Sequence, residues 1–94
     1  MGMSELKIEN NQSENRFEAL VNGRLAVLDY QIQESTMFLL YVAVPAEEKG
    51  RGVASDLARA ALEFARDSGF KVVPRCPFIS AYMRRHPELL KAVR

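Results

Sequence analysis

The sequence is poor in cysteine, in net charge and in long apolar stretches, and each shortage excludes a class of protein. Its single cysteine, Cys76, excludes an intrachain disulfide framework and favours a reducing compartment. A net charge of +1 at pH 7 provides no overall field for nucleic acid. No apolar run reaches the length of a membrane-spanning helix. Residues 1–6 lack the basic start and apolar core of a secretion signal. We therefore expect a cytoplasmic chain without nucleic-acid or membrane partners.

What remains is enough for one small folded unit. The chain has 94 residues, of which 48% are hydrophobic, and this length lies near the lower end of common domain sizes. We expect residues 1–94 to form a single domain, as a monomer or a weak dimer. A core of this size leaves little stability to spare, so a bound ligand should contribute measurably to it.

The first half of the chain predicts antiparallel strands. Asn22-Gly23 separates two β-like runs and is a strong hairpin signal, because a type I′ turn needs positive φ at both central residues. The last run is apolar from Met37 to Val42, which predicts burial on both faces of its strand. The predicted strands cover residues 6–9, 16–21, 24–33 and 36–44.

The second half predicts a helix, a strand and shorter helical pieces. Small apolar residues recur at helical spacing from Val53 to Ser68, and Gly69 is a helix stop. Strands 36–44 and 70–73, joined by this helix, should run parallel with a right-handed crossover. A short helix over 78–85 and a last helical turn over 88–93 follow. The predicted fold class is α+β, with an antiparallel sheet that ends in one parallel β-α-β unit.

The loop before the long helix predicts an anion site. Gly50 and Gly52 allow close backbone approach, the helix start leaves N–H groups free, and Lys49 and Arg51 add positive charge. These features favour a phosphate or pyrophosphate ligand at the ligand-binding edge of the sheet. A plain glycine turn before a surface helix is the alternative.

Two other nucleotide-binding motifs fit this loop less well. A Walker A loop ends in Gly-Lys-Ser/Thr, whereas Val53-Ala54-Ser55 follows Gly52 here. A dinucleotide fingerprint needs a third glycine where Ser55 stands, and an acidic residue at the end of the next strand, which instead ends Val72-Val73-Pro74.

With these elements, the chain resembles the GNAT superfamily of acetyl-CoA-dependent N-acetyltransferases, and is most similar to its short single-domain branch. The superfamily signature Gln/Arg-x-x-Gly-x-Gly/Ala corresponds to residues 49–54, where Gly52 and Ala54 match and Lys49 replaces Gln/Arg. The likeness continues through the tail, over roughly the last two-thirds of the chain. The tail residues that carry it are Arg75-Cys76-Pro77-Phe78, Tyr82 and His86-Pro87-Glu88-Leu89.

The resemblance implies a GNAT-like sheet whose two parallel strands splay apart around acetyl-CoA, the acetyl donor. The pantetheine arm would pair with Val42-Ala43-Val44, and the pyrophosphate would sit on the amides of residues 50–54. The implied donor-binding residues are Val42, Ala43, Val44, Lys49, Gly50, Arg51, Gly52, Val53, Ala54 and Ser55. The acceptor is an unidentified amine of a small molecule or a protein. We expect no metal, since one histidine and one cysteine show no ligand spacing.

Cys76 and Tyr82 are the candidate catalytic residues. Cys76 follows the second parallel strand, and three roles stay open: nucleophile carrying the acetyl group, acid or contact in direct transfer, or small buried hydrophobe. Tyr82 would protonate the CoA sulfur, as a tyrosine of the last helix does in many relatives, or pack as a core ring. Arg84 and Arg85 would meet the CoA 3′-phosphate or face solvent.

The resemblance favours direct transfer, the usual route of the superfamily. The expected function is N-acetyl transfer from acetyl-CoA. A CoA-binding module with little or no turnover is the alternative.

Overall fold

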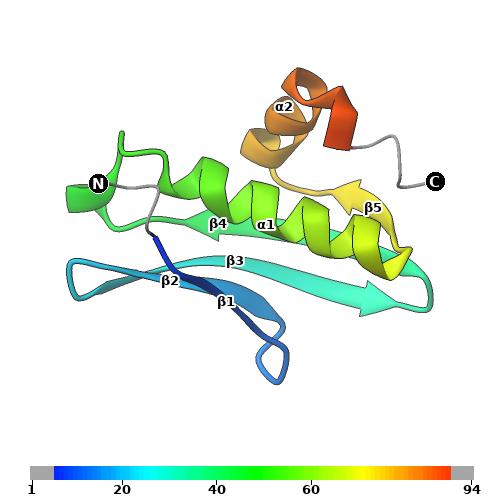
Figure 1. The fold of residues 1–94 in the computed structure, drawn as a ribbon, viewed down its shortest axis with the longest axis horizontal. Coiled ribbons are helices and arrows are strands. Elements are labelled where there is room, and N and C mark those ends of the chain that lie inside the picture. The colour runs from blue at the N-terminus through cyan, green and yellow to red at the C-terminus, as the bar shows by residue number, and fades with distance from the viewer. Residues whose placement is uncertain (1–5, 90–94) are drawn as a thin grey trace.

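A computed structural model describes residues 6–89, and within them five strands form one sheet in the order β1-β2-β3-β4-β5 (Figure 1). The strands are β1 (Ile8–Asn11), β2 (Arg16–Val21), β3 (Arg24–Gln33), β4 (Thr36–Ala43) and β5 (Lys71–Pro74). The helices are α1 (Val53–Ser68) and α2 (Pro77–Arg85), with short 3₁₀ helices η2 (Ala46–Glu48) and η3 (Pro87–Leu89). The predicted α+β class is confirmed. The helical turn predicted over 88–93 is described only to residue 89, and its remainder lies outside the described residues.

The β2–β3 hairpin has the predicted turn. Asn22 and Gly23 have φ of 52° and 79°, so both central residues are in the left-handed region that a type I′ turn requires. Strand β1 is displaced by two residues from the predicted 6–9. It extends to Asn11 because antiparallel pairing with β2 continues as far as Asn11↔Arg16.

The parallel strands β4 and β5 separate toward their carboxyl ends. Their pairing runs only from Thr36↔Lys71 to Leu39↔Pro74, and the Arg75 N–H donates to the Leu39 carbonyl at 2.8 Å. The β3–β4 register shifts after Asp29, which adds one residue to β4 and increases its local twist. β4 then continues to Ala43 beside β3 alone, so the splayed geometry implied by the resemblance is present.

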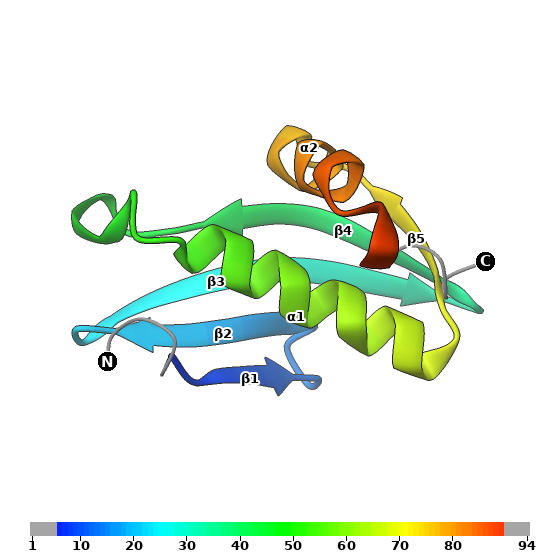
Figure 2. The same ribbon diagram turned by 45° about the horizontal axis from the view of Figure 1, so that its top comes forward.

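The core lies on one face of the sheet, beneath α1. Helix α1 lies across one face of the sheet (Figure 2). Its buried stripe packs on that face, and the mostly small side chains of the stripe allow close approach. The predicted burial of β4 on both faces is wrong: Met37 and Leu39 are fully buried, whereas Tyr41 is 49% exposed. The reason is that the buried residues of the described helices and strands form a single cluster, which leaves the opposite face open. The stripe of α1 consists of Val53, Leu57, Ala58, Ala61, Leu62 and Ala65.

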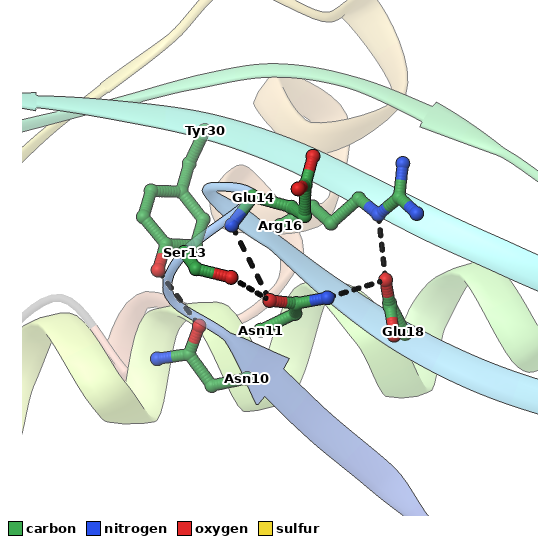
Figure 3. A network of polar contacts seen from close by, with 7 residues as sticks. All are labelled: Asn10, Asn11, Ser13, Glu14, Arg16, Glu18 and Tyr30. Carbon is green, nitrogen blue, oxygen red and sulfur yellow. Dashed lines mark hydrogen bonds and ion pairs between the residues drawn. The ribbon is translucent and has the colours of Figure 1, made fainter.

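A polar network ties β1 to β2 and β3 (Figure 3). The buried Tyr30 hydroxyl donates to Asn10 Oδ1 at 2.7 Å. Glu18 accepts hydrogen bonds from Asn11 Nδ2 at 3.0 Å and from Arg16 Nε at 2.6 Å. These contacts hold the short edge strand, whose four residues give it few ladder hydrogen bonds.

Candidate functional site

A pocket of about 570 Å³ opens where β4 leaves β5, at the amino end of α1. It brings together three segments that are separate in sequence: the end of β4, the glycine loop with the first turn of α1, and the start of α2. Its lining residues are Val42, Ala43, Val44, Glu48, Lys49, Gly50, Gly52, Val53, Ala54, Ser55 and Phe78.

The β4 side of the pocket is an unpaired strand edge. Residues 40–43 follow the last β5 partner, Leu39, and residues 41–43 pair with β3 on their other side, with Val42 opposite Leu28. The edge turned toward α2 therefore offers backbone N–H and C=O groups to an extended ligand, in the way an added strand would use them.

The loop side of the pocket depends on two glycines. Gly50 and Gly52 have φ of 83° and 82°, and a Cβ at either would meet nothing within 4 Å. Glycine is thus needed for the backbone conformation and not for space. Gly52 is the N-cap of α1 and provides no side-chain cap. The first-turn N–H groups of α1, with their partial positive charge, therefore remain available to an anion.

Among the predicted donor-binding residues, Arg51 alone does not line the pocket. Its Nε lies 3.6 Å from Glu48 Oε1. Two lining residues were not among the predicted site residues: Glu48 and Phe78. Nothing local in the sequence distinguishes Glu48 from its exposed neighbour Glu47. Phe78 could have been found, because it lies in the first turn of the helix that follows the second parallel strand.

Cys76 lies at the N-cap of α2 and is partly buried. Its carbonyl accepts the Ser80 N–H at 2.9 Å, and the side chain contacts the core cluster. It does not line the pocket, although Phe78, two residues later, does.

Tyr82 is 4% exposed and is also absent from the pocket lining. Its ring stacks against Phe78, with centroids 6.3 Å apart, and lies 4.2 Å from the His86 ring. Electrostatic interaction with the nearby Tyr82 side chain is the main cause that raises the pKa of Arg59. In the first turn of α1, burial raises the pKa of the Asp56 carboxyl.

Residues 6–89 contain no cluster of His, Cys, Asp and Glu side chains that could hold a metal ion. Within the same range, neither helix is both long and apolar enough to cross a membrane. Arg84 and Arg85 are exposed on the last turn of α2.

The separated parallel strands, with a glycine loop at the amino end of the connecting helix, define an N-acetyltransferase type of fold. The family model described as GCN5-related N-acetyl-transferase matches residues 16–93. The chain belongs to the GCN5-related N-acetyltransferase family, as the sequence signature predicted.

Known proteins similar to this chain agree with that assignment. Protein NATD1 of Xenopus tropicalis is 29% identical over 87 residues, which cover 89% of this chain and 80% of that protein. Human Protein NATD1 is 28% identical over 85 residues, covering 87% and 75% respectively. The solution structure of a GCN5-like protein from Staphylococcus aureus superposes with a TM-score of 0.73 at 25% identity, covering 98% of this chain and 91% of that one.

Proposed function

We propose that the chain binds acetyl-CoA in this pocket and transfers the acetyl group to an amine. The observation that carries the proposal is the meeting of an open β4 edge with the amino end of α1 in one pocket. The pantetheine arm contains amides that suit a strand edge, and a pyrophosphate suits the glycine loop and the uncapped helix start. Family membership makes acetyl-CoA the expected donor.

The transfer needs few groups from the protein. The amine nitrogen attacks the thioester carbon, the carbonyl oxygen becomes an oxyanion, and the carbon–sulfur bond then breaks. CoA leaves as a thiolate and gains a proton, while the amine nitrogen loses one, giving an amide and free CoA. A backbone N–H near Val44 is our candidate donor to the oxyanion, since preplaced donors stabilise the charge that develops there.

Cys76 and Tyr82 are the candidates for handling the proton of the leaving thiolate. Cys76 follows β5, across the split from the end of β4, which favours contact with the thioester end of the donor. We favour direct transfer, with Cys76 as an acid or contact near the sulfur, over a covalent acetyl-cysteine.

The second candidate function is a CoA-binding module with little or no turnover. The observation that favours it is the position of Cys76 and Tyr82 outside the pocket lining, with Tyr82 almost completely buried. Both functions use the same donor site, so they differ in turnover and not in CoA affinity.

Calorimetry with CoA, followed by intact-protein mass spectrometry after incubation with acetyl-CoA, separates these possibilities. We expect CoA binding, no stable acetyl adduct, and acetylation of at least one member of an amine panel, with the rate lowered at least tenfold in Cys76→Ala. Tyr82→Phe is the matched variant for Tyr82, the other candidate for protonating the leaving thiolate.

A hydroxylamine-labile adduct that is absent from Cys76→Ala would replace direct transfer by a covalent route. Binding without turnover would select the module. Absence of CoA binding by the wild type would overturn the proposal.

A further inference from the structure

Glu48 is a buried carboxylate at the edge of the pocket. It is 3% exposed, whereas the side chain of Glu47, its neighbour in the same short 3₁₀ helix, is 62% exposed. An ionised carboxylate is costly to bury unless cations and hydrogen-bond donors surround it. The environment of Glu48 must therefore be built for this charge.

Two segments far apart in sequence provide that environment. Asn22 Nδ2 donates to Glu48 Oε1 at 3.1 Å, and Arg24 Nη1 lies 3.6 Å from Oε2. These residues begin and follow the β2–β3 turn. Arg51, from the glycine loop, places its Nε 3.6 Å from Oε1. Glu48 thus joins the β2–β3 turn to the glycine loop, at the end of the molecule where both lie (Figures 1 and 2).

The surrounding charges balance the carboxylate. Arg24 and Arg51 are each about half exposed, at 48% and 51% of their side chains, and Arg24 also approaches Glu47 at 3.4 Å. Lys49, next to Glu48, lines the pocket. The Glu48 carboxylate therefore meets one cation from the β2–β3 turn and one from the glycine loop. Glu48 itself lines the pocket.

We propose that Glu48 is a positioning residue for the phosphate groups of the donor. By fixing residues 49–52 against the β2–β3 turn, it holds the loop amides in the arrangement that a nucleotide pyrophosphate requires. Preorganisation of this kind raises affinity by reducing the ordering that binding would otherwise need. This inference rests on the proposed function, because it assigns Glu48 to the same donor site.

The proposed role has an effect of defined sign. As a bare negative charge near the loop, Glu48 would repel phosphate, so its neutralisation would strengthen CoA binding. As a positioning residue, it strengthens binding despite its sign, so the same change would weaken CoA binding. The two roles are therefore distinguished by one neutral variant of nearly equal size.

The test compares CoA with pantetheine, which lacks the phosphates, by titration monitored with ¹⁵N–¹H NMR. Glu48→Gln keeps an amide oxygen for Asn22 but loses both ion pairs. We expect it to weaken CoA binding about tenfold, because the loop loses the two ion pairs that order it, and to leave pantetheine binding within twofold. Glu47→Gln, in the same 3₁₀ helix, is the matched control and should not weaken binding of either ligand.

Asn22→Gly provides an independent arm, since glycine keeps the φ of 52° and removes only the contact to Glu48. It should weaken CoA binding several-fold and spare pantetheine. Unchanged or tighter CoA binding in Glu48→Gln, or equal weakening of both ligands, would overturn the positioning role. If Glu48→Gln does not fold, Asn22→Gly decides by the same criteria. Failure of the wild type to bind CoA would instead remove the proposed function and this role together.

Discussion

At the scale of single residues, the environment of Glu18 sets the pKa of its carboxyl. Glu18 on β2 accepts hydrogen bonds from Arg16 and Asn11, and these lower the pKa of its carboxyl below the usual 4.5, with Arg16 the larger cause (Figure 3). The folded-state pKa is depressed, so the pair favours folding at pH above 4.5. That contribution disappears as the pH falls through the lower folded-state value.

We predict that Glu18 titrates below pH 4.5 in the wild type and moves toward that value in Arg16→Gln, because the principal donor is removed. Side-chain carboxyl shifts followed by NMR against pH measure the midpoint directly. Arg24→Gln, which removes a cation elsewhere, should leave it unchanged. A wild-type midpoint at or above 4.5, or one insensitive to Arg16→Gln, would contradict the assignment.

At the scale of an element, α1 begins and ends at glycines of the same conformation. Gly52 and Gly69 have φ of 82° and 79°, and a Cβ at either would meet nothing within 4 Å. The sequence located this helix to the residue, because a small apolar stripe lies between these two local signals. Of these two glycines, Gly52 lines the pocket and Gly69 does not.

Gly52→Ala and Gly69→Ala are therefore predicted to lower the free energy of unfolding by a similar amount, roughly 1–2 kcal/mol, from left-handed backbone strain. Only Gly52→Ala should also weaken CoA binding, because it alters the backbone of the pocket. Denaturant unfolding and calorimetry on both variants test this pair. Equal CoA affinities for the two variants would show that the conformation of Gly52 does not matter to the site.

At the scale of the whole molecule, one small core supports both the fold and the pocket. Leu62 is fully buried in the cluster between α1 and the sheet, whereas Leu20 on the open face is 65% exposed. Domains of this kind have a free energy of unfolding of about 5–15 kcal/mol in total. The free energy lost by creating a single cavity in the core is thus a large fraction of the total free energy of unfolding.

Leu62→Ala is predicted to lower the free energy of unfolding by about 2–5 kcal/mol, and Leu20→Ala by no more than about 0.5 kcal/mol. CoA at about 100 times its Kd should restore about 2.7 kcal/mol to either variant, since it binds only the folded state. Thermal and denaturant unfolding with and without CoA measure both effects. An unfolding midpoint that CoA does not raise would count against donor binding.

The sequence alone determined the elements whose signals are local. Asn22-Gly23 specified the hairpin, and the apolar stripe with its flanking glycines specified α1. The loop at 49–54 specified the family, and the resemblance to that family implied nine of the eleven residues that line the pocket. These features depend on turn conformation, helical periodicity and short spacing, which are determined by residues close together along the chain.

Only the tertiary structure decided which face of β4 is buried and where individual side chains of the site point. Glu48 is buried where Asn22, 26 residues earlier in the chain, donates a hydrogen bond to it, whereas Glu47 stays exposed although Arg24 approaches both carboxylates. Tyr82 on α2 likewise comes close enough to Arg59 on α1 to raise the pKa of that guanidinium. Burial and partner choice are set by packing between segments that local sequence does not relate, so no nearby residue encodes them.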